Sequence, residues 1–190
     1  MIKSLLLFCL CSSLLNIHLI AQPSIQWQKS LGGTNEDWAR SIQQTTDSGY
    51  IVAGYSSSNN GDVSGNHGGS DYWVVKLNSL GAITWKKCFG GTGNDEAFSI
   101  QQTADGGYIV AGYSSSTDGD VTGHHGSAIS SDYWIVKLNS LGAISWQKSL
   151  GGTLPDIARA IQQTTDGGYI VVGCSYRSEE HTSELQSPYV

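Results

Sequence analysis

The chain repeats one pattern three times, and this repetition constrains its fold more than any other feature. A tryptophan segment ending in Gly-Gly-Thr occupies Ile25–Thr34, Ile83–Thr92 and Ile144–Thr153, and a second segment occupies Thr45–Gly54, Thr103–Gly112 and Thr164–Gly173. The period is 58 residues from Trp27 to Trp85 and 61 residues from Trp85 to Trp146. A fixed period of this size indicates stacked repeats, in which no unit can bury its apolar surface alone.

Each unit contains four short runs with the length and composition of β-strands. In the second unit these runs are Ala97–Gln102, Tyr108–Tyr113, Asp132–Asn139 and Ile144–Leu150. They alternate in polarity or are rich in β-branched and aromatic residues, and none has a helical period. The turns between them contain glycine, which accepts the positive φ of tight hairpins. The sequence therefore predicts an all-β fold built from four-stranded antiparallel units.

The second run of each unit contains a glycine inside an otherwise apolar stretch, at Gly54, Gly112 and Gly173. A glycine inside a strand weakens it, so it needs a reason such as a bulge or the close approach of another backbone. We expect crowding at these positions, where neighbouring units converge. The alternative is that the glycines only begin the loop that follows.

The hairpin from Trp73 to Trp85 resembles the outer hairpin of quinoprotein-type propeller blades. Asn78, Gly81 and Trp85 match the Asp, Gly and Trp of that motif, whose tryptophan docks on the neighbouring blade; this chain has Leu-Gly-Ala where the family has Thr-Gly-Lys. The cofactor-binding residues of the quinone enzymes have no counterpart here. The whole unit, over Ile25–Tyr176, is similar to tandem repeats in exported proteins of Bacteroidota, which often carry a type IX secretion sorting domain.

This resemblance implies an incomplete β-propeller with two full blades and one partial blade. The expected blades are residues 39–89, 97–150 and 158–176, and Ile25–Leu31 is expected as a lone fourth strand. Because a propeller ring needs at least four blades, we expect the chain to be a fragment whose open faces aggregate or bind a hydrophobic dye. In the full protein, Ile25–Leu31 is then predicted to complete the last blade and close the ring.

Both ends of the chain differ from the repeat region. Residues 1–21 have the charged start, the apolar centre and the small closing residue, Ala21, of a secretory signal peptide. After Tyr176 the repeat gives way to a polar tail. Codons chosen for Arg177–Ser187 reproduce, base for base, a widely used short-read sequencing adapter, so we interpret residues 177–190 as non-native. Resequencing the locus tests this interpretation, and a genuine stop codon directly after Val190 would contradict it.

Charge and cysteine content narrow the function classes. Residues 22–176 carry eight Lys and Arg against thirteen Asp and Glu, a net charge of −5, and no basic stripe for nucleic acid is present. Cys88 and Cys174 fall at non-equivalent positions of the repeat, so no disulfide framework is expected. We expect a secreted or cell-surface protein with no membrane span once the signal peptide is removed.

Residues that recur in every unit are interpreted as architectural, because an active site is needed only once. Asp47, Asp105 and Asp166 precede glycine in hairpin turns and are expected to accept backbone N–H bonds. Aspartates that follow each Gly-Gly-Thr turn or open a third strand are expected to form similar local bonds. The tryptophans are expected to pack between blades; they are Trp27, Trp85 and Trp146 in the hairpins and Trp73 and Trp134 in the third strands. Trp38 is unique; Phe98 and Ile157 are taken to occupy its place. An aromatic pair there could stack on a sugar, but packing between blades is the favoured interpretation.

The long loops that vary between units supply the candidate ligand residues. These are Asn60, Asp62 and His67 in the first loop and Asp118, Asp120 and His124 in the second. Aspartates flanked by glycine and hydroxyl groups suit part of a Ca²⁺ site, which takes six to eight oxygen ligands. A zinc site needs three or four convergent ligands, of which adjacent His124 and His125 supply at most one or two. No cofactor is assigned, and calcium stays an open alternative.

Two functions are compatible with these patterns. The first is a non-enzymatic exported module that binds a protein or a glycan through its loops, since nearly identical units present similar surfaces. The second is a propeller-type polysaccharide hydrolase or lyase, which requires blades that diverge at channel-facing positions. No nucleophile elbow or phosphate-binding glycine loop is present in the sequence, so the sequence favours the binding module and assigns no catalytic residue.

Overall fold

The computed structural model describes residues 24–127 and 130–176 of the chain. The predicted signal peptide and the predicted non-native tail lie outside the described residues. Every regular element in the described ranges is a β-strand. The strands are β1 (Asp37–Gln44), β2 (Tyr50–Ser56), β3 (Asp71–Leu77), β4 (Ile83–Phe89), β5 (Asp95–Gln102), β6 (Tyr108–Ser114), β7 (Asp132–Leu138), β8 (Ile144–Leu150), β9 (Asp156–Gln163) and β10 (Tyr169–Ser175).

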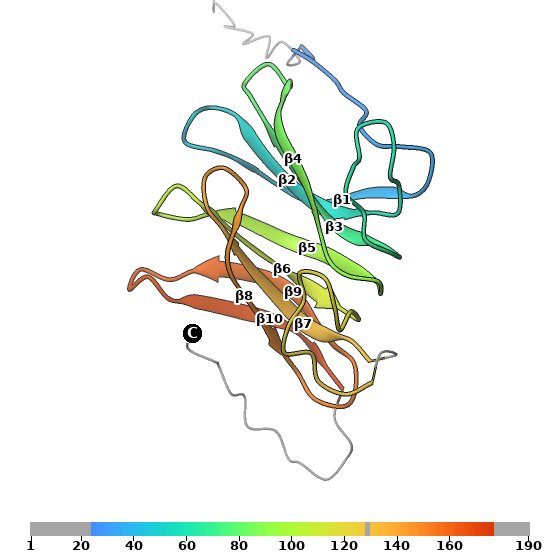
Figure 1. The fold of residues 1–190 in the computed structure, drawn as a ribbon. Helices are drawn as coiled ribbons and strands as arrows, with labels where there is room; N and C mark the ends of the chain where they lie inside the picture. Colours follow the sequence, from blue (N-terminus) through green and yellow to red (C-terminus); the bar gives the residue numbers. More distant parts are fainter. Residues whose placement is uncertain (1–23, 128–129, 177–190) are drawn as a thin grey trace, which may run out of the picture.

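The strands form three separate antiparallel sheets (Figure 1). The first has the order β1-β2-β3-β4, the second β5-β6-β7-β8, and the third contains only β9 and β10. This confirms the all-β fold and the four-stranded antiparallel unit. Each first strand begins two residues before the predicted alanine, because an aspartate there already pairs with the last serine of the second strand, as Asp37 does with Ser56.

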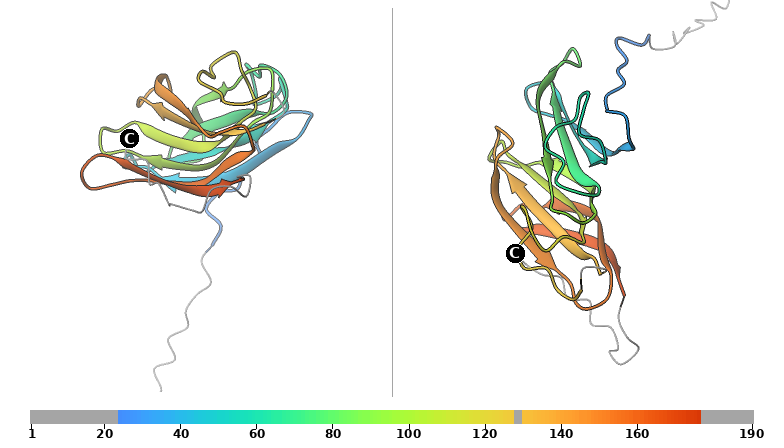
Figure 2. Two further views of the ribbon diagram at one scale, coloured as in Figure 1. Left: turned by 90° about the horizontal axis from the view of Figure 1, so that it is seen from below. Right: turned by 45° about the vertical axis from the view of Figure 1, so that its right-hand side comes forward.

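The sheets pack face to face, and the main core lies between them (Figure 2). Between the first and second sheets, Ile51 and Tyr72 meet Val110 and the fully buried Trp134. The Tyr72 hydroxyl donates a hydrogen bond to the Trp134 carbonyl oxygen at 2.8 Å. A second cluster of the same kind joins the second sheet to β9 and β10. Each sheet thus needs its neighbours to bury its apolar faces.

The first strands of consecutive sheets lie beside one another, so β5 contacts both β1 and β9. Their exposed edges are joined by side chains. Gln43 Oε1 accepts the Gln102 N–H at 2.6 Å, and Gln102 Oε1 accepts the Thr46 N–H at 2.9 Å. Because an unpaired strand edge otherwise leaves N–H groups without partners, these inter-sheet glutamine bonds explain the repeated Gln-Gln pair.

The expected lone strand at Ile25–Leu31 is not formed. A strand needs a ladder partner, and none of the described strands pairs with this segment. Its Trp27 nevertheless packs edge-on against Tyr50, with ring centroids 5.6 Å apart, much as Trp85 packs against Tyr108 at 5.8 Å. The segment therefore occupies the tryptophan position of a preceding unit without a strand. Its role in closing a ring stays a prediction.

Candidate functional site

The repeated hairpin aspartates are bound within their own turns. The carboxylates of Asp47, Asp105 and Asp166 each accept the N–H of the glycine two residues later and the hydroxyl of the threonine two residues earlier. Lys76 Nζ lies 2.8 Å from Asp47, and Lys137 Nζ lies 2.9 Å from Asp105. The lysine and threonine bonds lower the pKa of these two carboxyl groups. The aspartates thus anchor two almost buried lysines, which sequence reasoning did not identify.

Four of the loop candidates hold the Gly-Gly-Thr turns. Asn60 Oδ1 accepts the Thr34 N–H at 3.0 Å, and Asp118 Oδ1 accepts the Thr92 N–H at 2.8 Å. Asp62 and Asp120 accept N–H bonds from the first glycine of the same two turns, each at 3.3 Å. The two pairs therefore serve different turns and do not converge. Across residues 24–127 and 130–176, no three His, Cys, Asp or Glu side chains are grouped so that they could hold a metal ion.

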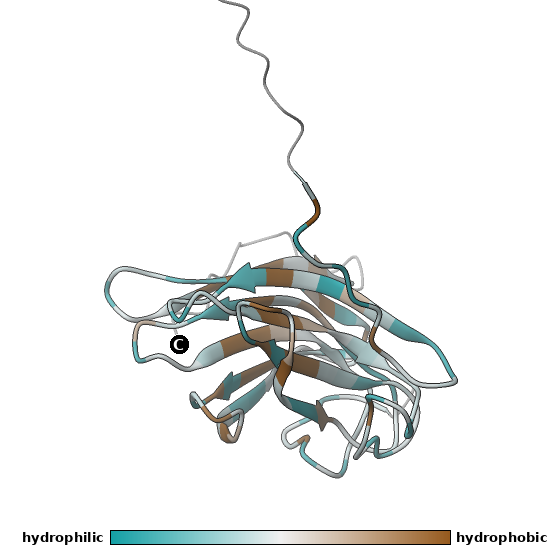
Figure 3. Ribbon diagram, turned by 90° about the horizontal axis from the view of Figure 1, so that it is seen from above, coloured by the Kyte–Doolittle hydropathy of each residue, from teal (hydrophilic) through white to brown (hydrophobic). Residues whose placement is uncertain are grey.

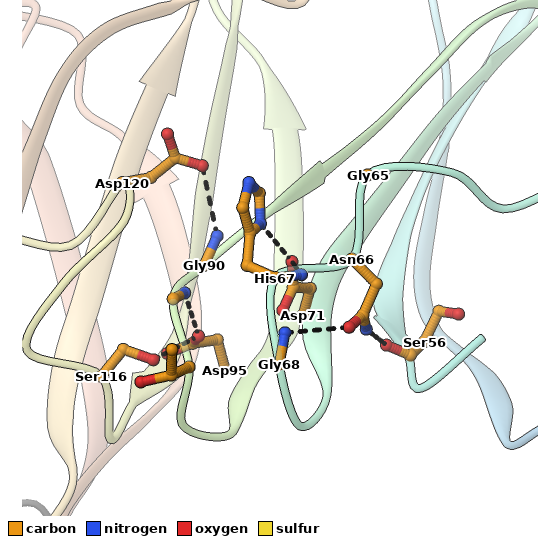
Figure 4. A network of polar contacts seen from close by, with 12 residues as sticks. Ser56, Gly65, Asn66, His67, Gly68, Asp71, Gly90, Asp95, Ser116 and Asp120 are labelled. Atoms are coloured by element: carbon orange, nitrogen blue, oxygen red, sulfur yellow. Dashed lines mark hydrogen bonds and ion pairs between the residues drawn. The ribbon is translucent and has the colours of Figure 1, made fainter. Parts of the chain in front are cut away.

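The histidine candidates lie beside buried aspartates that open the third strands. His67 Nδ1 is 2.6 Å from Asp71 Oδ2, and the same oxygen accepts the His67 N–H (Figure 4). In the second unit, His125 makes the equivalent contacts with Asp132, while His124 Nε2 lies 3.3 Å from the Ser127 carbonyl oxygen. The sequence named His124 as the ligand candidate, and the structure gives His125 the position of His67.

Two of the loop candidates, His67 and Asp120, do share a pocket. It has a volume of about 500 Å³, and Lys86, Lys87 and Cys88 also line it. The hydrogen bond to Asp71 raises the pKa of His67, and burial raises the pKa of the Cys88 thiol to about 12. A thiol with so high a pKa is a poor nucleophile, so the pocket offers charged groups for binding and no activated thiol.

The repeated polar residues also include pairs of buried carboxylates between sheets. Asp71 and Asp95 flank Gly90, and Asp132 and Asp156 flank the equivalent glycine of the next junction. Figure 4 shows Asp71 and Asp95 with their partners, among them Ser116, whose hydroxyl donates to Asp95 at 2.7 Å. Burial raises the pKa of Asp71 to about 6. The pairs are fixed by the packing and are inaccessible from solvent.

Side chains that differ between the units gather on the first strands. The ladder places Trp38 opposite Tyr55 and Glu96 opposite Tyr113, so Glu96 is the equivalent of Trp38. The expected equivalence of Trp38 with Phe98 is wrong, because Phe98 lies two residues further along the strand. The two variable positions hold Trp38, Glu96 and Ile157 at the first, and Arg40, Phe98 and Arg159 at the second.

The second variable position is the extra residue of a β-bulge in every unit. Register shifts between Ala39 and Ser41, and at the equivalent points of β5 and β9, leave Arg40, Phe98 and Arg159 without a ladder partner. A bulge re-aims its side chain away from the regular alternation of the strand. The repeated backbone feature thus presents a different side chain from each unit.

These side chains form an arginine–aromatic cluster, defined as Trp38, Arg40, Tyr55, Phe98 and Arg159. The Arg40 guanidinium lies 5.1 Å from the Trp38 ring centroid and 5.3 Å from that of Phe98. The Arg159 guanidinium lies 4.5 Å from the centroid of the Phe98 ring, so both arginines contact this ring. Trp38 stacks on Tyr55 with an interplanar angle of 17°. Guanidinium groups within about 6 Å of an aromatic ring are attracted by its π-face. These contacts therefore hold the aromatic rings and the two guanidinium groups of the cluster in place.

The cluster is accessible to a ligand. Trp38 is 49% exposed, both arginines are exposed, and Phe98 is partly buried. Glu96 adds one carboxylate, which raises the pKa of its cross-strand partner Tyr113 further, beyond the effect of burial. Sequence reasoning singled out Trp38 and Phe98 but neither arginine. The signal for the others was present, since these positions vary between units that are otherwise nearly identical.

The tryptophans of the repeat lie in the packed regions. Trp73 and Trp134 belong to buried clusters, and Trp146 packs edge-on against Tyr169 at 5.8 Å. No family model matches the chain, and no curated protein matches it. Within the described ranges no helix is long and apolar enough to cross a membrane.

Proposed function

We propose that the protein is an exported β-propeller module, secreted or at the cell surface, that binds a glycan through the arginine–aromatic cluster. The propeller assignment draws support from the four-stranded antiparallel sheets and from the adjoining first strands. In a propeller the first strands would line the central channel. The cluster would then lie at that channel, where variation between blades is most useful for binding.

The observation that carries the proposal is the contrast between repeated and variable residues. The repeated aspartates, glutamines and lysines already have partners inside the fold. The exposed residues that vary, Trp38 and Arg40 above all, are held in place by one another. Polar groups that are satisfied internally are poor ligand groups, whereas an exposed indole beside a guanidinium offers an apolar face and strong hydrogen-bond donors.

The same chemistry favours a glycan over a protein surface. A sugar ring presents a C–H face that packs on an indole, and its hydroxyl or carboxylate groups accept hydrogen bonds from a guanidinium. Arginine binds carboxylates in a bidentate manner, so acidic polysaccharides should bind more tightly than neutral ones. A protein ligand is the other outcome of the test below.

Affinity measurements with the full chain test the proposal. Neutral and uronic-acid-containing polysaccharides are titrated against the protein, Trp38→Ala and Arg40→Ala. Each variant should bind at least about tenfold more weakly, which corresponds to about 1.4 kcal/mol. Leu141→Ala, at an exposed hairpin tip, is the control and should bind like the parent. Unchanged binding by both cluster variants, or binding to proteins alone, would contradict the proposed glycan site.

A polysaccharide hydrolase or lyase is the second candidate function, and Glu96 is the observation that favours it. This carboxylate stands at a variable position of β5, the first strand of the second sheet. Most glycoside hydrolases use two carboxyl groups, and Glu96 is the single one at the variable positions of the three described first strands. Release of new reducing ends or unsaturated products during the titrations, abolished in Glu96→Gln, would establish the enzyme instead.

A further inference from the structure

Two apolar sheet faces of the described chain lack a neighbouring sheet. The front face of the first sheet includes Ile42 and Val52, and the back face of the third sheet includes Ile170 and Val172. Ile42 is 63% exposed, and Ile170 and Val172 are 51% and 62% exposed. Figure 3 shows how hydrophobic segments recur along the strands. Monomeric soluble proteins seldom leave such faces open to water.

The two open faces carry the same residue types that pack against each other at the internal junctions between sheets. At both internal junctions, the back of one sheet packs on the front of the next. The front positions are identical in all three units: Ala39, Ala97 and Ala158; Ile42, Ile100 and Ile161; Tyr50, Tyr108 and Tyr169; Val52, Val110 and Val171. The back positions are Ile51, Ile109 and Ile170, and Ala53, Ala111 and Val172. Inside a junction these positions are buried, as Ile100 and Ile109 show.

The hydrogen-bonding edges are matched as well. At the first junction Ser41 Oγ accepts the Ile100 N–H at 3.3 Å, next to the inter-sheet glutamine bonds. By the same register, the N–H groups of Ile42 and Gln44 point outward from the open edge of β1. On the third sheet, Gln162 stands at the position whose glutamine accepts the N–H bond at both internal junctions. Along this edge the third unit departs from the pattern once, with Ala160 in place of the serine.

The front face is also hollowed to receive another surface. A cavity of about 490 Å³ lies over the first sheet, with Ile42, Val52, Trp73 and Val75 in its wall and Trp27 at its side. At the next junction, the equivalents of these wall residues are covered by the preceding sheet. The occupant that fits is therefore another sheet of this same repeat.

We propose that copies of this chain associate head to tail, with the back face of the third sheet of one copy on the front face of the first sheet of the next. The contact repeats the part of the internal junctions in which the second strand of one sheet lies against the first strand of the following sheet. The third sheet contains only β9 and β10, so the contacts that β3 and β7 make at those junctions have no counterpart in it. The interface is heterologous, so it joins two different surfaces and extends into rings or chains of copies. It does not rest on the proposed glycan function, although Trp38 and Arg40 also line the cavity over the first sheet.

Two charge substitutions test this arrangement in the full chain. Ile42→Glu alters the front face and Ile170→Glu alters the back face; both residues are more than half exposed, so neither change opens the core. Sedimentation velocity should show concentration-dependent oligomers for the parent chain and monomers for each variant alone. An equimolar mixture should form dimers and nothing larger, because one variant supplies an intact back and the other an intact front.

A control variant and three results that would contradict the head-to-tail contact complete the experiment. Leu80→Glu, on an exposed hairpin tip, should associate like the parent chain. A parent chain that stays monomeric at high concentration would overturn the proposal. Association that persists in Ile170→Glu alone would indicate front-to-front pairing, and aggregates that persist in both variants would indicate non-specific association; either result rejects the head-to-tail contact. None of these variants replaces a residue of the arginine–aromatic cluster, so glycan binding by the monomeric variants can be measured separately from association.

Discussion

Replacing Gly112 with alanine should destabilise the protein more than its small size suggests. Gly112 lies inside β6, opposite the bulge of β5. A Cβ atom there would lie well inside contact distance of the Glu96 carbonyl oxygen, 2.7 Å from the Tyr72 hydroxyl and 2.8 Å from the Ala97 Cα. Ordinary contacts between non-bonded carbon atoms are about 3.5–4.0 Å. Two of the three neighbours are backbone atoms, so the new methyl group cannot be accommodated by a rotamer change.

The expected cost follows from what must move. Separating β5 from β6 at the bulge weakens about two ladder hydrogen bonds, and displacing Tyr72 breaks its 2.8 Å bond to the Trp134 carbonyl. At about 0.5–1.5 kcal/mol for each hydrogen bond, Gly112→Ala should lower the free energy of unfolding by about 2–4 kcal/mol. This cost covers the upper part of the usual range of about 1–3 kcal/mol for overpacked sites and extends above it.

Urea unfolding of the full chain, followed by tryptophan fluorescence, measures this loss. Gly152→Ala is the matched control, because a Cβ atom at Gly152 would meet nothing within 4 Å and its φ is not in the left-handed region. The control should change stability by less than about 0.5 kcal/mol. If Gly112→Ala cost less than about 1 kcal/mol, the bulge would have room to relax and the reasoning from crowding would be refuted.

Two further predictions concern charges. Asp105→Asn leaves the nearly buried Lys137 without its carboxylate partner. It should lower the free energy of unfolding in urea by about 1–2 kcal/mol, which is less than the roughly 3–5 kcal/mol of a fully buried pair because Asp105 is exposed. Asp166→Asn, in a turn with no lysine partner among the described residues, should cost less, and equal losses would contradict this. His67 should titrate above 6.5 by NMR, since the hydrogen bond to Asp71 raises its pKa. The stability that protonated His67 contributes should decline as the pH rises through this raised pKa, and titration of His67 below 6.5 would contradict the prediction.

The strands were predictable because two units contain the full four-strand pattern and the third contains its first half. Alternating polarity, β-branched residues and glycine turns predicted the four-stranded sheets, and the number of repeats predicted the number of sheets. The inter-sheet bonds of Gln43 and Gln102 were not predictable, because a strand edge reveals its missing partners only when the neighbouring sheet is in place. Lys76 was missed for a similar reason: it lies within an apolar run, and its partner Asp47 is distant in sequence.

The arginines of the candidate site were missed, and Phe98 was misaligned with Trp38, where a bulge shifts the strand register. Counting along a regular strand from Asp37 puts Trp38, Arg40 and Ile42 on one side and Ala39 and Ser41 on the other. The bulge breaks that alternation after Ala39. The extra residue changes which side chains share a face, and no residue type in the first strand marks its place.

The glycines of the second strands are the one feature of the sequence that indicates the bulge. The bulge brings the carbonyl oxygens of Trp38, Glu96 and Ile157 against Gly54, Gly112 and Gly173, where a side chain has no room. The close approach that the sequence predicted is therefore real, although it comes mainly from the first strand of the same sheet and only partly from the neighbouring sheet. A glycine fixed in every unit thus permits the bulge, and the bulge presents a residue that is free to vary. On this reasoning Gly112→Ala should also displace Phe98 from between the two arginines, which links the stability of the sheet to the geometry of the proposed binding site.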